Sequence, residues 1–378
     1  MILIACDQIP YCGGANTRAY NLFGILSNRF DDMAFLNILD EKKVKYYEKH
    51  YSKSNLGNPD NLKDVFNVVV SPEKPEGFLN LKRFLYKLNP IAVLCVNRFS
   101  ALYIKKIRPD LKVLFFPSSC RKIIDNLNAV KSSYDAEKKL LSDNLKLDDD
   151  NYEEREAVKL SDSIIFHSES VKIFYEYFYP EYRGKMHSEL VYNVPFILEK
   201  LYKKKIKGIP FHKRKIDLTF VASRWDRPEK NYEMVKKIAK SFDGLKISVV
   251  GECEEKQKNI SYYGLIEDYP KVLSLMADSK VLISTSLYDA SPNVLFEAAF
   301  LNCNIVASRN CGNRRLCHSD LLVSSYTLNN YISCIEKALK KPYKSNLDIF
   351  LRSDSIKILE NIIREELKKQ GGSQRGML

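Results

Sequence analysis

Short apolar segments alternate with longer amphipathic segments along most of the chain. Residues 16–28 and 232–242 carry apolar side chains at helical spacing. Nine runs of five or six residues, rich in Val, Ile, Leu and Phe, are typical of strands buried on both faces of a parallel sheet. This alternation predicts an α/β protein. The nine expected strands cover residues 2–6, 66–70, 91–96, 112–116, 163–167, 217–222, 246–251, 280–285 and 304–308.

The alternation stops at a basic segment and restarts at Ile216. Within residues 199–215, eight Lys and Arg residues stand against one Glu. We therefore expect a hinge between two similar domains, and the hinge is either a solvated linker or a patch that faces a membrane or substrate. The expected units are an N-terminal Rossmann-like domain (1–195), a basic hinge (196–215), a C-terminal Rossmann-like domain (216–350), a helix that can cross back to the N-terminal domain (351–370) and a flexible tail (371–378).

Composition supports two folded domains. The chain has 378 residues, of which 45% are hydrophobic and 28% charged. No apolar run approaches the ~20 residues that span a bilayer, and no basic leader precedes the first apolar run, so we expect a cytoplasmic protein. The net charge of +13 favours an anionic partner, and peripheral contact with an anionic membrane is one option. We expect no nucleic-acid partner, because no nucleic-acid motif accompanies the charge; the pattern leaves the oligomeric state open.

Cysteines and acidic clusters do not indicate a metal. The nine cysteines lie partly in apolar runs, which is typical of reduced, buried thiols. Cys311, Cys317 and His318 in "CGNRRLCH" match no standard zinc spacing. The acidic run Asp148–Asp150 lies in a charged stretch and not after an apolar strand, which disfavours a metal-dependent transferase of the GT-A type. We expect neither a metal nor a cofactor.

Candidate binding residues follow the expected strands, where ligands bind in open parallel sheets. Gly13 and Gly14 precede the first helix, and paired glycines there let backbone N–H groups approach a phosphate. Arg224 ends a strand, and Lys230 follows six residues later. Two cations at one strand end suit a diphosphate, although either could instead form a surface salt bridge.

The segment "YDASPNVLFEAAF", Tyr288–Phe300, places a carboxylate inside an apolar helix. Ser291 is a plausible N-cap and Pro292 a natural first helical residue, so the helix N-terminus would face an anion. Glu297 lies among apolar side chains and either binds a polar ligand such as ribose or points to solvent. Asp289, in the preceding loop, could reach a second sugar.

These motifs resemble those of the retaining glycosyltransferases of family 4, which have the two-domain GT-B fold. "DASPNVLFEA" is similar to the family's E-x7-E motif, with Asp289 in place of the first Glu and Glu297 as the second. Arg224 and Lys230 match its Arg-x5-Lys segment, and "GGANTR" resembles its Gly-Gly-Ala loop. The similarity is strongest over residues 216–312 and diffuse over 1–195.

The resemblance implies a role for each matching residue. Arg224 and Lys230 would stabilise the donor diphosphate as it leaves, and Asp289 would hold the transferred hexose, so that these three form the expected catalytic set. Glu297 would bind the donor ribose. Further donor contacts are implied for Gly13 and Gly14 (phosphates), Ser291, Pro292, Asn293 and Val294 (hexose), and Tyr263, Leu265 and Ile266 (base).

The N-terminal half departs from the family pattern. Many relatives carry a His near the end of the strand that corresponds to residues 112–116, where this chain has Ser118, Ser119 and Arg121. These residues, with Asn97 and Arg98 after the preceding strand, are the candidates for the acceptor side. His167 also follows a strand and is a further candidate, although we expect it to be a hydrogen-bonded structural residue.

The sequence thus predicts a metal-independent, retaining glycosyltransferase. It would move a hexose from a nucleoside-diphosphate sugar to a hydroxyl of a glycan, glycoprotein or lipid-linked acceptor. Relatives often use GDP-mannose, UDP-glucose or UDP-N-acetylglucosamine, and the pattern does not choose among them. The alternative is a non-catalytic protein of the same fold that binds nucleotide sugars.

Overall fold

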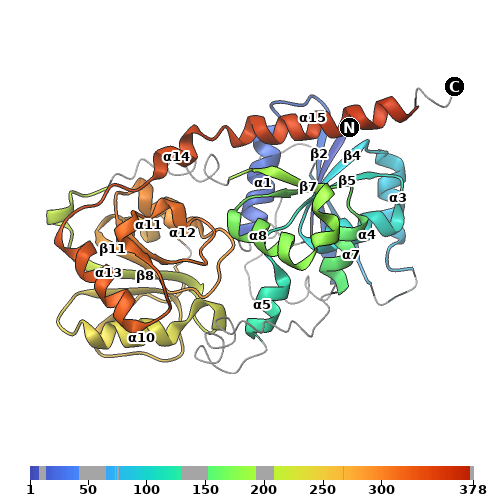
Figure 1. Ribbon diagram of the computed structural model, residues 1–378. Coiled ribbons are helices and arrows are strands. Elements are labelled where there is room, and N and C mark those ends of the chain that lie inside the picture. The colour runs from blue at the N-terminus through green and yellow to red at the C-terminus, as the bar shows by residue number, and fades with distance from the viewer. Residues whose placement is uncertain are drawn as a thin grey trace.

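Two parallel sheets form the framework of the protein. The computed structural model describes residues 1–7, 14–41, 65–72, 74, 76–128, 152–192, 208–266 and 268–374. The strands of the first sheet come from the N-terminal half and those of the second from the C-terminal half, so the chain forms two α/β domains side by side (Figure 1). This arrangement confirms the predicted fold class.

The N-terminal domain has a seven-stranded sheet in the order β3-β2-β1-β4-β5-β6-β7. Its strands are β1 (Ile2–Cys6), β2 (Met33–Asp40), β3 (Val65–Val70), β4 (Ala92–Val96), β5 (Lys112–Phe116), β6 (Ser163–Phe166) and β7 (Met186–Leu190). Its helices are α1 (Gly14–Leu26), α3 (Leu79–Leu88), α4 (Arg98–Ile107), α5 (Arg121–Asn128), α7 (Tyr152–Leu160), α8 (Glu169–Phe178) and the 3-10 turn η2 (Pro180–Lys185).

The C-terminal domain has a six-stranded sheet in the order β10-β9-β8-β11-β12-β13. Its strands are β8 (Ile216–Arg224), β9 (Ile247–Glu252), β10 (Ile260–Tyr262), β11 (Ser279–Ser284), β12 (Asn304–Ser308) and β13 (Leu322–Val323). Its helices are α10 (Tyr232–Ser241), α11 (Tyr269–Ala277), α12 (Asn293–Phe300), α13 (Leu328–Lys340) and α14 (Leu347–Arg352), with the 3-10 turns η3 (Phe211–Lys213), η4 (Pro228–Lys230), η5 (Arg314–Leu316) and η6 (Ser319–Leu321).

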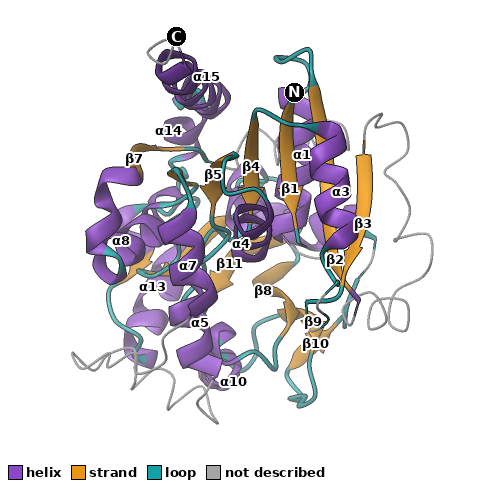
Figure 2. Cartoon of the chain, turned by 90° about the vertical axis from the view of Figure 1, so that its right-hand side faces the viewer, coloured by secondary structure: helices purple, strands orange, loops and turns teal. Residues whose placement is uncertain are grey.

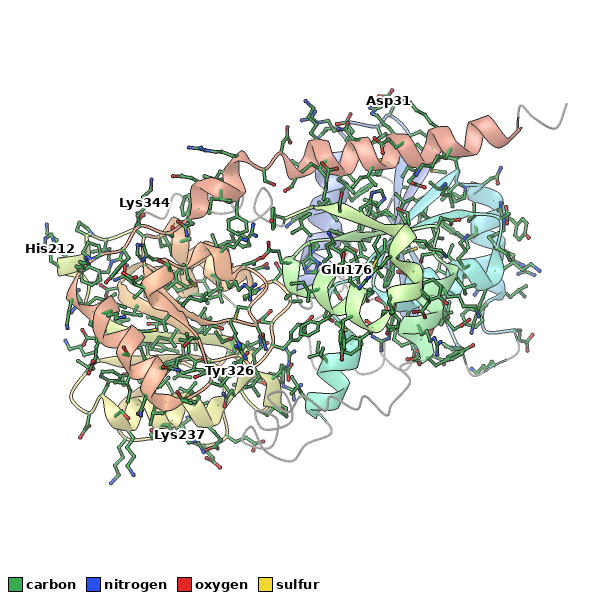
Figure 3. All side chains as sticks on the ribbon, viewed as in Figure 1. Asp31, Glu176, His212, Lys237, Tyr326 and Lys344 are labelled. Atoms are coloured by element: carbon green, nitrogen blue, oxygen red, sulfur yellow. The ribbon has the colours of Figure 1, made fainter. Side chains whose placement is uncertain are left out.

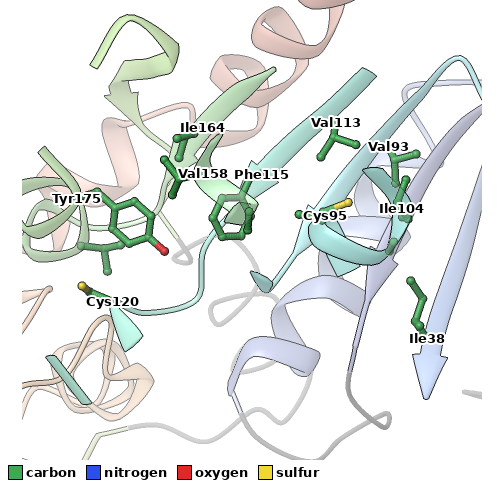
Figure 4. Packing of buried hydrophobic residues seen from close by; sticks show 14 of the residues in the cluster. Ile38, Val93, Cys95, Ile104, Val113, Phe115, Cys120, Val158, Ile164 and Tyr175 are labelled. Atoms are coloured by element: carbon green, nitrogen blue, oxygen red, sulfur yellow. The ribbon is translucent and has the colours of Figure 1, made fainter. Parts of the chain in front are cut away.

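Each face of the N-terminal sheet packs against its own hydrophobic core. Alternate residues of β1 point to opposite faces, so Leu3 and Ala5 enter one core while Ile2 and Ile4 enter the other. Figure 4 shows part of the first core, where side chains of neighbouring strands meet those of α4, α7 and α8. Burial on both faces explains why the strands read as nearly continuous apolar runs.

The last helix, α15 (Ser355–Gln374), leaves the C-terminal domain and packs on the N-terminal one. Leu359, Ile362 and Ile363 are part of the second N-terminal core. Lys112 Nζ on β5 lies 2.9 Å from Glu366 Oε2. Figure 1 shows α15 running along the N-terminal domain, and Figure 2 shows it beside α14 and above β7.

Candidate functional site

A cleft with a volume of about 730 Å³ lies between the two domains. This size is within the range of small-molecule sites. Its walls are formed by the segments that follow β1, β4 and β5 in one domain and β8 and β11 in the other, so both sheets present their carboxyl ends to it. Its lining residues are Asp7, Arg18, Asn97, Arg98, Phe99, Ser118, Ser119, Arg121, Ile124, Val221, Ala222, Ser223, Arg227, Glu229, Lys230, Ser284, Ser286, Tyr288, Asp289, Ala290, Ser291, Pro292, Asn293 and Val294.

Lys230 and Asp289 form an ion pair in this cleft. Lys230 Nζ lies 2.6 Å from Asp289 Oδ2, and both side chains are less than one-fifth exposed. The turn η4 that carries Lys230 is tied to the segment after β11, because Thr285 Oγ1 donates to the Lys230 carbonyl at 2.8 Å and the Leu287 N–H donates to the Glu229 carbonyl at 2.8 Å. The structure therefore brings together two residues that are 59 positions apart in the sequence.

The loop that carries Asp289 is held by the segment after β12. The Gly312 N–H donates to the Asp289 carbonyl at 2.8 Å, and the Asp289 N–H donates to the Asn310 carbonyl at 3.4 Å. A Cβ at Gly312 would lie 1.8 Å from the Ala290 carbonyl oxygen, so glycine is required for this close approach. The adjacent backbone fixes the position of the Asp289 carboxylate.

Tyr288 reaches from the C-terminal domain into the N-terminal core. Its side chain is 1% exposed, and its hydroxyl accepts the backbone N–H of Cys120 at 3.0 Å. Its ring lies 5.5 Å from that of Phe174, and burial raises the pKa of the Tyr288 hydroxyl. Tyr326 supports the same loop by donating its hydroxyl to the Leu287 carbonyl at 2.8 Å; Figure 3 shows Tyr326 at the side of the C-terminal domain that faces the N-terminal one.

Helix α12 points its N-terminus at the cleft, but its first residue differs from the prediction. The helix begins at Asn293 with Pro292 as N-cap and without a side-chain cap. The predicted cap by Ser291 is wrong, because the Ser291 hydroxyl accepts a hydrogen bond from Asn313 Nδ2 at 3.0 Å. Ser291, Pro292, Asn293 and Val294 all line the cleft, so the expected donor segment is at the site.

Glu297 does not face bulk solvent. It is 8% exposed, and its Oε1 accepts the hydroxyl of Tyr269 on α11 at 2.7 Å. Burial and the neighbouring Glu297 carboxylate raise the pKa of Tyr269. Glu297 is not among the residues that line the cleft, so its contact with a ribose stays a prediction.

Arg224 lies outside the cleft lining. Its side chain is 51% exposed and forms an ion pair with Asp226. Arg227, three residues later, lines the cleft and forms an ion pair with Glu229, whose side chain is 2% exposed. The sequence did not single out Arg227, and the assignment of Arg224 to the diphosphate stays a prediction.

The residues expected at the nucleotide base lie on an exposed turn beyond β10. Tyr263 and Leu265 are 40% and 49% exposed, and Ile266 is half-buried. The Gly251 N–H at the end of β9 donates to the Gly264 carbonyl at 2.7 Å, which places this turn at the carboxyl edge of the sheet. These three side chains are outside the cleft lining, so their role stays a prediction.

The opposite wall presents a row of polar side chains from the N-terminal domain. Asn97 Nδ2 donates to Asp7 Oδ1 at 2.8 Å, and the Ser118 hydroxyl donates to Asn97 Oδ1. Asn97 has a φ of 86°, a left-handed value that is uncommon outside glycine and costs conformational energy. Arg98, Ser119 and Arg121 complete the predicted acceptor-side set, and the cleft lining contains all five of its members.

Sequence reasoning missed two residues of this wall, Asp7 and Arg18. Asp7 directly follows β1, so its position after a strand was a usable signal. Arg18 lies in the first turns of α1, four residues after Gly14, which is the first residue of that helix. Gly13 lies outside the described residues.

His167 lies in the N-terminal domain and is fully buried. Burial and the positive charge of Arg18 hold the pKa of its imidazole well below the usual range. Its ring packs against Phe116 with 5.9 Å between centroids, and it does not line the cleft. His167 therefore sits as a neutral side chain behind the site.

The described part of the chain contains no group of three or more His, Cys, Asp or Glu residues arranged to hold a metal ion. Within the same part, none of the helices is both long and apolar enough to cross a membrane.

Comparison with known proteins places the fold. No family model matches the sequence, and no curated protein matches it. Several solved structures, in contrast, are similar to the structure of this chain. The lipopolysaccharide outer core galactosyltransferase WaaB has a TM-score of 0.63 at 13% identity, over 97% of this chain and 99% of WaaB. Sucrose-phosphate synthase from Thermosynechococcus elongatus has a TM-score of 0.61 at 14% identity, over 100% of this chain and 99% of that one.

The chain has the GT-B fold. Anabaena HepE, solved in complex with UDP and glucose, has a TM-score of 0.58 at 12% identity over the whole of both chains. A UDP-GlcNAc 2-epimerase from Methanocaldococcus jannaschii is also similar, with a TM-score of 0.53 at 14% identity over 96% of this chain and 99% of that one. Identities this low show a shared architecture, and the reaction has to be argued from the site.

Proposed function

We propose that this protein is a glycosyltransferase that moves a hexose from a nucleoside-diphosphate sugar to an acceptor hydroxyl. The observation that carries the proposal is the Lys230–Asp289 pair beside the N-terminus of α12, in a cleft between two parallel sheets. A cation, free helical N–H groups and a carboxylate are what a diphosphate joined to a sugar requires. The similar structures WaaB, named a galactosyltransferase, and HepE, solved with UDP and glucose, support this reading.

On the donor side, Lys230 binds the diphosphate and the N–H groups at the start of α12 add to its stabilisation. The bond between the anomeric carbon and the diphosphate oxygen breaks and leaves its electron pair on that oxygen, while the acceptor hydroxyl oxygen bonds to the anomeric carbon and gives its proton to the departing phosphate. Negative charge grows on the diphosphate as it leaves, and preorganised positive groups lower the barrier. Asp289, once Lys230 turns to the phosphates, can accept hydrogen bonds from hexose hydroxyls. Arg224 can join Lys230 by leaving Asp226, because that pair is exposed and weak.

The reaction is proposed to retain anomeric configuration and to proceed without a metal ion. A metal ion is not required in this proposal because Lys230 and Arg227, which line the cleft, can stabilise the negative charge of the leaving diphosphate. NMR of the first-formed product shows whether configuration is retained, and turnover in EDTA shows whether a divalent ion is needed. An inverted product or full loss of activity in EDTA would refute the corresponding statement.

The donor site is tested by calorimetry with GDP-mannose, UDP-glucose and UDP-N-acetylglucosamine. Lys230→Ala should weaken binding of the preferred donor by roughly 10- to 150-fold, because a hydrogen bond to a charged group contributes about 1.5–3 kcal/mol. Lys280→Ala is the matched control, since Lys280 Nζ pairs with Asp217 Oδ1 at 2.8 Å where β8 and β11 begin, at the far edge of the same sheet.

Each outcome has a meaning. Unchanged donor affinity in Lys230→Ala, or equal losses in both variants, would remove the diphosphate from this site. Tight donor binding without transfer to any hydroxyl would favour the non-catalytic alternative. Conversion of the bound UDP-N-acetylglucosamine to an epimer would instead place the protein with the epimerases of this fold.

A further inference from the structure

The positively charged side chains that the C-terminal domain contributes to the cleft are each paired with a carboxylate. Arg227 is paired with Glu229, and Lys230 is paired with Asp289. Each positive charge that this domain contributes to the cleft lining therefore has its own carboxylate nearby. A ligand that binds this wall must compete with, or replace, those acids.

The N-terminal wall carries an excess of positive charge. Arg18, Arg98 and Arg121 line the cleft from this side, and Asp7 is the one acidic side chain among its lining residues. Asp7 already accepts a hydrogen bond from Asn97. Within the lining residues, the arginines of this wall thus exceed its acids by two.

Arg18 is the most unusual member of this group. It is 5% exposed, and its Nε and Nη1 have no hydrogen-bond partner among the described residues. Its guanidinium carbon lies 5.7 Å from the centroid of the Phe116 ring. Burial lowers the pKa of Arg18 to about 9, so the side chain still carries its charge at neutral pH.

A buried charge without a partner is costly, and proteins normally pair it. The groups whose charges act on Arg18 are Cys6, in the same domain, and then Asp289 across the cleft, and Asp289 is itself held by Lys230 at 2.6 Å. Among the described residues none forms a hydrogen bond to Arg18 Nε or Nη1, so a bound anion in the cleft can supply a direct partner.

Arg98 and Arg121 line the cleft together with polar groups that suit a sugar. The guanidinium carbon of Arg98 lies 4.3 Å from the centroid of the Phe99 ring, and its Nε forms an ion pair with Glu153 Oε2 at 3.7 Å, which is longer than a hydrogen bond. Asn97 directly precedes Arg98, and Ser118 lies three residues before Arg121; their amide and hydroxyl groups line the cleft and can bond sugar hydroxyls. The wall therefore combines sugar-binding and anion-binding groups.

We propose that the acceptor is a phosphorylated sugar, whose phosphate is bound by Arg18 with Arg98 and Arg121 beside it. Every phosphorylated sugar is an anion at neutral pH, and a phosphate monoester carries a charge of about −1.5 to −2. Guanidinium groups bind phosphate oxygens in a bidentate way, so such an anion can supply the partner that the Arg18 guanidinium lacks. The proposal rests on the proposed function, because it names the acceptor class of the same cleft.

The test compares the binding of nucleotides and of sugar phosphates in the wild type and in two variants. Calorimetry measures UDP and GDP binding first, and then glucose 6-phosphate, N-acetylglucosamine 1-phosphate and unphosphorylated glucose at saturating nucleotide. In the wild type, a sugar phosphate should bind and glucose should bind at least about tenfold more weakly. Arg18→Met should lose sugar-phosphate binding by a similar factor and keep nucleotide affinity, whereas Lys230→Ala should do the reverse.

The contrary results are distinct. If Arg18→Met weakens nucleotide binding as much as Lys230→Ala does, Arg18 serves the donor diphosphate and the proposal fails. If the wild type binds nucleotide but neither a soluble sugar phosphate nor phosphatidylcholine vesicles that carry a polyisoprenyl-phosphate sugar, the acceptor class is wrong while the proposed function stands. If it binds sugar phosphates and no nucleotide, the proposed function fails and the anion site stands. Binding in either the soluble or the vesicle arm alone supports the proposal and identifies the source.

Folding is controlled in the same experiment. Arg18→Met keeps the apolar stem and removes an unpaired charge, so its denaturation midpoint should be unchanged or higher. Arg121→Gln, at the start of α5, changes the same wall at a half-buried position. A second loss of sugar-phosphate affinity in that variant, with the nucleotide affinity kept, supports the assignment, and unchanged affinity in both variants overturns it.

Discussion

Replacing Gly312 by Ala should disturb the cleft and the contact between the domains with a single methyl group. Gly312 follows β12, and its N–H holds the carbonyl of Asp289 at 2.8 Å. Its backbone lies so close to the Asp289 loop that a Cβ would be 1.8 Å from the Ala290 carbonyl oxygen and 2.9 Å from Ser168 Cβ. Ser168 belongs to the N-terminal domain, so the added methyl group would clash with both domains.

The size of the effect follows from those distances. The Ala290 carbonyl oxygen would have to retreat by more than an ångström before the contact reaches the 3.0 Å that real Cβ atoms keep. That oxygen is main chain, so it cannot move by a rotamer change, and Asp289 moves with it. Overpacking of this kind typically costs about 1–3 kcal/mol, and donor affinity should fall by roughly 5- to 150-fold because the energy is needed to restore the bound geometry.

Gly24→Ala is the matched control. Gly24 lies within α1 and has no atom within 4 Å of the position of an added Cβ. The same substitution there should stabilise the protein by about 0.5–1 kcal/mol, because alanine favours helix more than glycine does.

The assay is chemical denaturation together with calorimetric titration of the preferred nucleotide sugar. The expected pattern is a lower midpoint and weaker binding for Gly312→Ala, and a higher midpoint with unchanged binding for Gly24→Ala. Wild-type donor affinity in Gly312→Ala would show that the Asp289 loop can shift without harm, and the reasoning about its fixed position would be refuted.

Two further substitutions test buried groups. Tyr288→Phe removes the acceptor of the Cys120 N–H and should destabilise the protein by about 1–3 kcal/mol in denaturation, whereas Tyr177→Phe, at a side chain that is 65% exposed, should change it by less than about 0.5 kcal/mol; equal effects would show that the bond between the domains is unimportant. His167 stays neutral in the fold while the unfolded chain binds a proton near pH 6.5, so stability should fall as the pH drops below about 6.5, by up to about 1.4 kcal/mol per pH unit from this group. His167→Gln should lose that part of the pH dependence between pH 7 and 5, and superimposable profiles for the two proteins would contradict the assignment.

The strands most visible in the sequence were those buried on both faces. All nine expected runs coincide with strands in the structure, and in most of them the apolar side chains fill a core on each side. Strand β3 is the exception, because it lies at the edge of its sheet and its Val69 is 45% exposed. Strand β2 was missed since Asn37 interrupts its pattern. The groups that accept hydrogen bonds from Asn37 Nδ2 belong to Tyr20 and Asn67, which are 17 and 30 residues away. Strands β10 and β13 have only three and two residues, too few for a periodic signal.

The site was partly predictable for a similar reason. Residues in the loops and turns that follow strands, such as Lys230 and Asp289, can be found by position, and the structure places both in the cleft. The capping by Ser291 could not be excluded from sequence, because the competing donor, Asn313, comes from a different loop. Arg18 could not be ranked either, since its lack of partners is a property of the folded surroundings.

The buried position of Tyr288 has a consequence for how the two lobes separate. Tyr288, the residue next to Asp289, is buried in the N-terminal core. Any wide separation of the two domains must therefore withdraw the Tyr288 ring from that core and release the Asp289 loop with it. An opened molecule would then lack the arrangement of Lys230 and Asp289 that we propose binds the donor. We expect such coupling to protect a bound sugar nucleotide from wasteful hydrolysis, since reactive geometry and exposure to water would never coexist.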